Sequence, residues 1–260
     1  MTHPYFEGAP FPRVLAHRGL LTGSGEDAVV FDNSAAALAA ADAAGVVYLE
    51  TDVRATADGD PVLFHDETLE RLLGDPRPVA QVATAELQEL FAAHGGLLTL
   101  TEALDLFPRL RFNVDVKASS AAAAIGVAVA PHGHRVLLTS FRDANRRTAL
   151  DAAAGAGAPV LPASSGGQRA IALLRLASAL RLGAWARRIL SGLDAVQIPE
   201  RFGFVRVFTP ALVRAAHASG VEVHVWTIDD PAQMRRLVAQ GADGIVTDRA
   251  DLALATLPSR

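Results

Sequence analysis

Short runs rich in β-branched residues alternate with Ala- and Leu-rich stretches along almost the whole sequence. Eight of these runs are expected to be strands: Val14–Ala16, Val46–Val53, Arg111–Val116, Arg135–Thr139, Pro159–Pro162, Ala195–Ile198, Val221–Thr227 and Gly244–Thr247. The stretches between them include four expected helices: Ser34–Ala44 with Ser34 as its N-cap, Thr101–Phe107, Pro210–Ser219, and Pro231–Gln240, which ends at Gly241. Eight strand–helix alternations predict an α/β protein, a single (β/α)8 TIM barrel over residues 1–260. A doubly wound sheet fits less well, because no G-x-G-x-x-G turn follows the first strand.

Charged residues close the first three apolar runs, where uncompensated burial would cost free energy. They are His17 and Arg18 after the first run, Glu50 and Asp52 in the second, His65 and Asp66 soon after it, and Asp115 and Lys117 in the third. The carboxyl ends of the strands of a TIM barrel meet at one mouth. Residues two apart share one face of a strand. We therefore expect Glu50, Asp52 and Asp115 to converge there.

An all-oxygen ligand set of this kind favours Mg²⁺ or Ca²⁺ over zinc. A divalent cation held by the three acids would neutralise a phosphate, and His17 and His65 would move protons beside it. The sequence therefore indicates metal-assisted chemistry on a phosphate group.

Lys117 is the only lysine among 24 basic residues; the other 23 are arginines. A chain that uses arginine everywhere else is expected to keep a lysine where a compact ammonium is needed. Lys117 is therefore a candidate phosphate ligand. The alternative is an ordinary structural ion pair with Asp115 or Glu50.

The composition excludes several classes of protein. The net charge of −4 and the pI near 6.1 give no reason to expect nucleic-acid binding. The absence of cysteine excludes disulfides and thiolate metal sites. We see no signal-peptide pattern after Met1, and arginines interrupt every long apolar stretch, so a cytoplasmic protein is expected.

One segment differs from the rest: residues 166–192 form an Arg-rich helical insert. From Gln168 to Leu190 the chain holds five arginines and no acidic residue, after the Gly- and Ser-rich residues 164–167. This pattern predicts a basic amphipathic helix or a pair of helices. It is either a barrel-covering helix with solvated arginines or a surface element that makes transient contact with anionic lipid or substrate.

Ordered motifs along residues 14–252 resemble the glycerophosphodiester phosphodiesterase family. They are Leu15-Ala16-His17-Arg18-Gly19, Asn33-Ser34, Leu49-Glu50-Thr51-Asp52-Val53, the segment from Thr56 to Asp66, Asn113-Val114-Asp115-Val116-Lys117, Ser140-Phe141, Val225-Trp226-Thr227-Ile228, and the segment from Gly241 to Asp248. The Arg-rich insert matches least well. The resemblance implies a TIM barrel of the phospholipase C-like phosphodiesterase type, a divalent cation, and hydrolysis of glycerophosphodiesters to glycerol 3-phosphate and an alcohol.

The resemblance also implies roles for the matching residues. Glu50, Asp52 and Asp115 would bind the metal, His17 and His65 would form the acid–base pair, and Arg18 and Lys117 would bind phosphate. The family usually has glutamate at the position of Asp115, so contact with the metal through water is left open. It also usually has Pro-Glu-Asn-Thr in place of Phe31-Asp32-Asn33-Ser34, which makes Asp32 a partner of Arg18 or a helix cap.

Other polar and aromatic residues near the strand ends are weaker candidates. Trp226 is a candidate substrate contact, for glycerol or a lipid tail, or else packing. Gln197 and Glu200 are candidates for contact with the alcohol group. Asp243 and Asp248 are interpreted as turn or cap residues. The remaining histidines gain no support from their spacing: His94, His132, His134, His217 and His224.

Two further interpretations stay open beside the glycerophosphodiesterase. One keeps the barrel and the chemistry but assigns lipid substrates, as in a lysophospholipase D or sphingomyelinase D-like enzyme. The other is a non-catalytic barrel that binds phosphodiesters. Which histidine is the base, and whether water or a substrate hydroxyl attacks first, is left open by the sequence.

Overall fold

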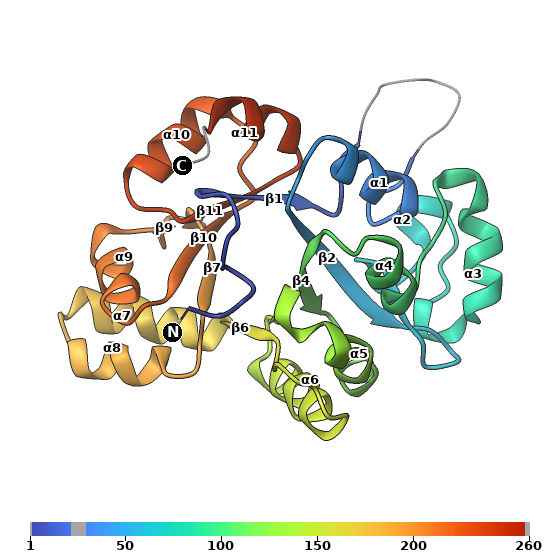
Figure 1. The fold of residues 1–260 in the computed structure, drawn as a ribbon, viewed down its shortest axis with the longest axis horizontal. Coiled ribbons are helices and arrows are strands. Elements are labelled where there is room, and N and C mark those ends of the chain that lie inside the picture. Colours follow the sequence, from blue (N-terminus) through green and yellow to red (C-terminus); the bar gives the residue numbers. More distant parts are fainter. Residues whose placement is uncertain (1, 22–29, 258–260) are drawn as a thin grey trace.

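Eight parallel strands close into a barrel in the computed structural model, which describes residues 2–21 and 30–257 (Figure 1). In order around the barrel they are β1 (Arg13–His17), β11 (Gly244–Thr247), β10 (Glu222–Trp226), β7 (Ala195–Pro199), β6 (Ala163–Gly166), β5 (Val136–Thr139), β4 (Arg111–Val116) and β2 (Tyr48–Ala55). Pairing of β1 with both β11 and β2 closes the ring. The predicted TIM barrel is confirmed. The predicted domain limits at residues 1 and 260 lie outside the described residues.

Helices cover the outside of the barrel (Figure 1). They are α1 (Ala35–Ala43), α2 (Glu70–Leu73), α3 (Thr84–Phe91), α4 (Leu100–Leu106), α5 (Ala122–Val129), α6 (Asp143–Gly155), α7 (Gln168–Ala179), α8 (Gly183–Leu190), α9 (Pro210–His217), α10 (Pro231–Ala239) and α11 (Ala250–Thr256), with short 3₁₀ turns at Val79–Gln81, Ala92–His94 and Ala130–Arg135. The side chains of Ser34, Thr99, Thr209 and Asp230 accept backbone hydrogen bonds at helix starts. Such caps satisfy amide groups that the first turn leaves unpaired.

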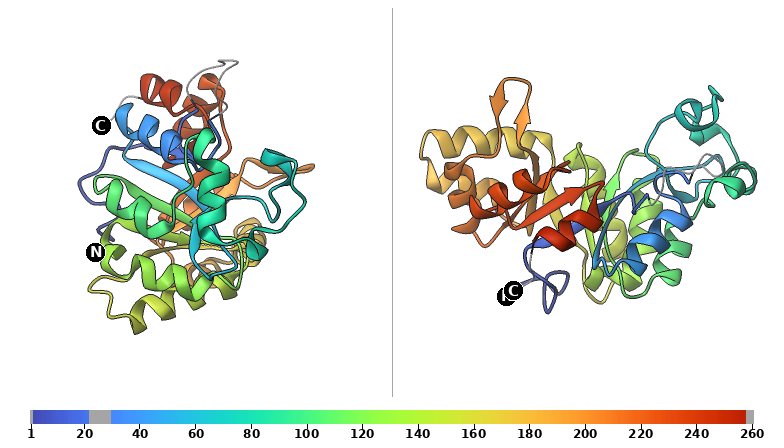
Figure 2. Two further views of the ribbon diagram at one scale, coloured as in Figure 1. Left: turned by 90° about the vertical axis from the view of Figure 1, so that its right-hand side faces the viewer. Right: turned by 90° about the horizontal axis from the view of Figure 1, so that it is seen from above.

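The amino-terminal end of the barrel is filled with apolar side chains. Tyr5 and Phe6 are buried against inward-facing residues of the strands, including Leu15, Tyr48 and Val246. Arg111 donates hydrogen bonds to three carbonyl oxygens within residues 4–7 and so fixes this plug. The plug lies at the end of the barrel opposite to a projecting orange hairpin (Figure 2, right). The carboxyl end of the barrel, by contrast, opens into a cavity.

A strand outside the barrel follows β2. The short β3 (Pro61–Leu63) pairs with β2 in antiparallel fashion. The chain beyond it carries α2 and α3 around a separate small core, which includes Phe64, Leu87 and Phe91. This arrangement carries His65 to the rim of the barrel.

The sequence prediction of a strand at Pro159–Pro162 is wrong. The strand at this place is β6, whose Ala163 and Ser164 pair with Leu137 and Leu138 of β5. Proline has no amide hydrogen for a strand ladder, so pairing begins after Pro162. The Gly- and Ser-rich residues that precede the Arg-rich segment thus belong mostly to a buried barrel strand.

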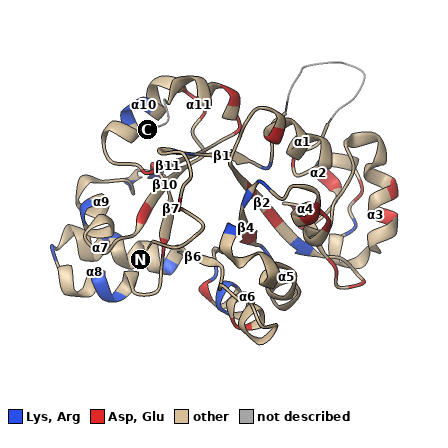
Figure 3. Cartoon of the chain, viewed as in Figure 1, with Lys and Arg blue, Asp and Glu red and all other residues tan. Residues whose placement is uncertain are grey.

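The Arg-rich segment forms the two helices α7 and α8, which carry basic but no acidic side chains (Figure 3). A small hairpin of β8 (Arg201–Phe202) and β9 (Val205–Arg206), which the sequence did not predict, follows β7. No helix in the described part of the chain is both long enough and apolar enough to cross a membrane.

Candidate active site

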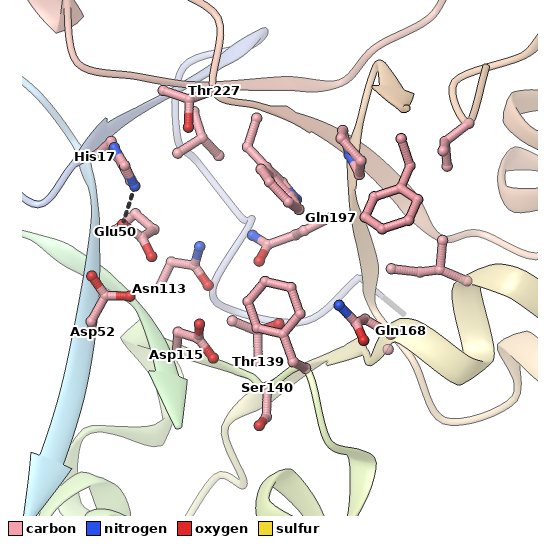
Figure 4. A pocket seen from close by; sticks show the side chains of 18 of the residues that line it. His17, Glu50, Asp52, Asn113, Asp115, Thr139, Ser140, Gln168, Gln197 and Thr227 are labelled. Carbon is pink, nitrogen blue, oxygen red and sulfur yellow. Dashed lines mark ion pairs between the residues drawn. The ribbon is translucent and has the colours of Figure 1, made fainter. Parts of the chain in front are cut away.

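A cavity of about 640 Å³ opens at the carboxyl end of the barrel strands. All eight residues assigned to the site from the sequence line it: His17, Arg18, Glu50, Asp52, His65, Asp115, Lys117 and Trp226. Figure 4 shows His17, Glu50, Asp52 and Asp115 together on one side, on the strands β1, β2 and β4. Alternate residues of a strand face the inside of the barrel. At the plugged end these inward-facing residues are apolar, and at the open end they are polar, which brings the polar side chains together in the cavity.

His17 is the last residue of β1, and its ring is oriented by a hydrogen bond at Nδ1. Its Nδ1 lies 2.6 Å from Asp248 Oδ1, and its Nε2 lies 3.8 Å from Glu50 Oε2. Burial would lower the pKa of His17, but the hydrogen bond to Asp248 and the charge of Glu50 outweigh it and raise the pKa above its usual value. Asp248, interpreted from the sequence as a turn or cap residue, therefore contacts the site directly.

A strained turn after β1 places Arg18. The backbone φ of Arg18 is +59°, and that of Gly19 is +98°. A Cβ atom on Gly19 would lie 2.7 Å from Ala37 of α1, so only glycine fits the turn. The side chain of Arg18 forms ion pairs with Asp52 at 2.7 Å and Asp32 at 3.1 Å. Asp32 is thus a partner of Arg18, whereas the cap of α1 is Ser34.

Asn33 connects this turn to β2. Its φ is +61°, a conformation that asparagine tolerates better than most residues. Its backbone amide donates to Arg18 O at 2.8 Å, its Nδ2 donates to Asp52 Oδ2 at 3.3 Å, and its Oδ1 accepts from Thr51 at 2.7 Å. Asn33 therefore positions Asp52. The sequence motif indicates no such role for Asn33, because the contact with Asp52 depends on the left-handed backbone conformation of Asn33.

Lys117 lies between two of the acids. Its Nζ is 2.8 Å from Asp52 Oδ1 and 2.7 Å from Asp115 Oδ2. The strand register explains the contact, since Asp52 of β2 lies opposite Asp115 of β4. The lone lysine is thus an ion-pair partner of Asp52 and Asp115, and it also lines the cavity.

The pKa values of the three carboxyl groups are shifted in different directions. Burial, and then the charge of Asp52, raise the pKa of Glu50 to about 8. Burial also raises the pKa of Asp115, although Lys117 opposes the shift. Burial would raise the pKa of Asp52, but Lys117 and Arg18 outweigh it and lower the pKa. Asp52 is therefore the acid of the group that most favours its charged form, whereas the contact of Glu50 with His17 and the charge of Arg18 do not offset its burial.

His65 reaches the cavity from the loop after β3. Its Nδ1 lies 2.7 Å from Asp66 Oδ1, and Arg71 bridges Asp66 to Asp32. Arg54 donates a hydrogen bond to the backbone oxygen of His65 at 2.8 Å. Both predicted catalytic histidines thus line one cavity, and each has a carboxylate at Nδ1.

Several buried oxygens of the site accept no hydrogen bond from the described residues. Among the described residues, Glu50 Oε2, Asp115 Oδ1 and Asn113 Oδ1 are buried without a hydrogen bond. Unsatisfied buried carboxylate and amide oxygens are suited to a hard divalent cation. No group of three or more His, Asp or Glu side chains in the described part of the chain is already placed to hold an ion, and Lys117 separates Asp52 from Asp115. The residues fit a cation, and the metal site stays a prediction.

Asn113 also lines the cavity and was not predicted from the sequence. It lies opposite Glu50 in the register of β4 with β2 and has neither amide atom hydrogen-bonded among the described residues. Its position two residues before Asp115 places both on one strand face, a signal that the sequence does contain. Gln197 also lines the cavity, whereas Glu200 is not among the lining residues and pairs with Arg236 and Arg206.

Comparisons with known proteins identify the family of the chain. The model of the Glycerophosphoryl diester phosphodiesterase family matches residues 17–252. The chain belongs to this family. A relative from Mycobacterium tuberculosis, named "Probable glycerophosphodiester phosphodiesterase 2", is 37% identical over 259 residues, covering 97% of this chain and 96% of the relative. Family membership makes the protein a phosphoric diester hydrolase, as the sequence predicts.

Solved structures show the same fold. A phosphodiesterase from Oleispira antarctica, in complex with the product sn-glycerol-3-phosphate, superposes with a TM-score of 0.70 at 23% identity and covers 95% of this chain and 97% of its own. The glycerophosphodiester phosphodiesterase from Thermotoga maritima superposes with a TM-score of 0.68 at 24% identity, covering 93% and 96%. The family's fold is therefore present along nearly the whole chain.

Proposed function

We propose that the protein is a metal-dependent glycerophosphodiester phosphodiesterase that releases glycerol 3-phosphate and an alcohol, with His17 and His65 as the acid–base pair. The observation that carries the proposal is the pairing of each histidine with a carboxylate. Asp248 and Asp66 lie 2.6 and 2.7 Å from the respective Nδ1 atoms. Both rings also line the cavity that holds the acids. The family and the product bound to the Oleispira antarctica structure support the substrate class.

Each carboxylate favours a proton on the Nδ1 atom of its histidine, which leaves Nε2 as the atom that exchanges protons. One histidine, neutral at the start, takes a proton from the attacking hydroxyl. The other, protonated at the start, gives its proton to the alkoxide as the phosphorus–oxygen bond breaks. One turnover thus leaves the two protonation states exchanged, and solvent restores them.

Glu50, Asp52 and Asp115 would hold the divalent cation, with Asn113 beside them. When bound, the cation neutralises phosphate oxygens and favours charge development on them. Arg18 and Lys117 are the basic side chains on the same side of the cavity. Their contacts with Asp52 hold them close to where the phosphate would bind. Ion pairs with the acids therefore keep the side chains of Arg18 and Lys117 in place before the substrate binds.

An assay with glycerophosphocholine tests the proposal. Purified protein treated with EDTA should release little glycerol 3-phosphate, and added Mg²⁺ or Ca²⁺ should restore the rate. Full activity after EDTA would contradict the role of the cation. Binding of glycerophosphocholine without any release of choline, under every metal condition, would instead support a non-catalytic phosphodiester-binding barrel.

A further inference from the structure

The cavity has two chemically different sides. The charged residues described above lie at the ends of β1, β2 and β4 and in the loop after β3. The opposite side is formed largely by Ile171 and Ala172 of α7, by Val207, and by Phe202 and Val205 of the β8–β9 hairpin. Trp226 and Phe141, which are in edge-to-face contact, also line the cavity. Its acidic lining residues are Glu50, Asp52 and Asp115, all on the charged side. The phosphate chemistry uses only one side.

The β8–β9 hairpin exposes apolar side chains at the mouth. Phe202 and Val205 lie directly opposite each other in the hairpin register, and 73% and 56% of their surfaces are exposed although both line the cavity. Phe204 at the tip is fully exposed and does not line the cavity. The hairpin projects from the body of the protein (Figure 2, right). Exposed apolar groups gathered at the mouth of a pocket indicate an apolar ligand.

The size and charge of the cavity also favour an apolar ligand. Its volume of about 640 Å³ equals that of roughly 20 liquid waters, more than glycerol phosphate requires. Arg175 lies on the apolar side and donates a hydrogen bond to the backbone oxygen of Arg206 in the hairpin at 3.0 Å. A guanidinium there, with no acid beside it in the lining, disfavours a cationic group such as choline on this wall. An uncharged hydrocarbon chain is the group that fits it.

We propose that the wall formed by Ile171, Phe202, Val205 and Val207 binds a hydrocarbon chain of the substrate, so that the enzyme acts on lysophospholipids, glycerophosphodiesters whose glycerol still carries one acyl chain. This inference rests on the proposed phosphodiesterase function. In the reaction the bond between phosphorus and the headgroup oxygen breaks. Water supplies the new oxygen on phosphorus, one of its protons leaves with the headgroup alcohol, and the acyl glycerol phosphate is released.

A chain-length series tests the inference with one leaving group throughout. Choline release is measured from glycerophosphocholine and from hexanoyl, octanoyl and decanoyl lysophosphatidylcholine, each below its micelle concentration. We expect kcat/KM to rise with chain length, by up to about fourfold for each methylene that becomes buried. Choline release from glycerophosphocholine with no rise along the acyl series would overturn the inference and leave the phosphodiesterase function intact. No release from any of the four would contradict the function itself, and the inference with it.

Variants of the hairpin locate the binding wall. Phe202→Ser and Val205→Ser should flatten the dependence of kcat/KM on chain length, because both side chains line the cavity. Phe204→Ser is the matched control: it makes the same change on the same hairpin, outside the cavity, and should keep the dependence. All three side chains are more than half exposed, so the melting temperature should stay unchanged. A dependence that survives Phe202→Ser and Val205→Ser but is lost in Phe204→Ser would contradict the inference and indicate docking on a lipid surface.

Discussion

His17 and Asp248 meet where the barrel closes, with His17 Nδ1 2.6 Å from Asp248 Oδ1 across a sequence separation of 231 residues. The two residues follow the neighbouring strands β1 and β11, in which Ala16 lies opposite Thr247. A carboxylate at Nδ1 orients the ring and favours its protonated form. Asp248 is therefore a positioning residue for the histidine that we propose as one of the catalytic pair.

Replacing Asp248 by asparagine should reduce kcat/KM at least about tenfold and shift its pH profile. The hydrogen bond from Asp248 helps to raise the pKa of His17, so the profile limb that reports His17 should move to lower pH in Asp248→Asn. Asp251→Asn removes an exposed acid of the next helix, paired with Arg249, and serves as control. A profile unchanged from that of the parent would show that Asp248 does not act on His17.

Lys117→Arg should keep the fold and lose most of the activity. An arginine preserves the charge between Asp52 and Asp115, so we expect an unchanged melting temperature. The planar guanidinium is larger than an ammonium and prefers two-point contacts, so it would crowd the space beside these acids. If kcat/KM on glycerophosphocholine equals that of the parent, the role assigned to the lone lysine is wrong.

The lowered pKa of Glu222 predicts how the free energy of unfolding depends on pH. Burial would raise the pKa of Glu222, but hydrogen bonds and charges from His224 and Arg13 outweigh it, so the pKa lies below its ordinary value. The stabilisation is therefore complete above the ordinary glutamate pKa near 4.3 and is lost as pH falls through the lowered pKa.

Glu222→Gln should accordingly lower the free energy of unfolding by roughly 1–3 kcal/mol at neutral pH. The difference from the parent should shrink in acid. Urea unfolding at both pH values measures this, with Glu89→Gln on the exposed face of α3 as control. A difference that grows in acid would reverse the sign argued here.

The sequence predicted most barrel strands because their local patterns are strong. The strands β4 and β11 match the predicted ranges Arg111–Val116 and Gly244–Thr247. β6 was missed, since Ala163-Ser164-Ser165-Gly166 has no β-branched residue, and small side chains there leave room inside the barrel. Local pattern rules have no means of recognising such a strand, because its burial comes from the closed barrel around it.

The charged residues that line the cavity were predicted for the same reason. The pairs Arg18–Asp32 and Lys117–Asp115 were each predicted as one of two alternatives, whereas the contacts of Asp248 and Asn33 were not predicted. Charged residues at strand ends are visible along the chain. The contacts of Asp248 with His17, and of Asn33 with Asp52, depend on barrel closure and on a left-handed backbone at Asn33. Lys117 was expected to reach phosphate, and its simultaneous ion pairs with Asp52 and Asp115 follow from a strand register that the sequence does not specify.

The most direct measurement is the rate of glycerol 3-phosphate release from glycerophosphocholine by His17→Ala and His65→Ala. His134→Ala, an exposed histidine outside the cavity, is the control. We predict that each site variant loses on the order of 10²-fold or more in kcat, with an unchanged melting temperature, and that the control keeps the parent rate. Parent-level turnover by either His17→Ala or His65→Ala would contradict the acid–base pair on which the account depends.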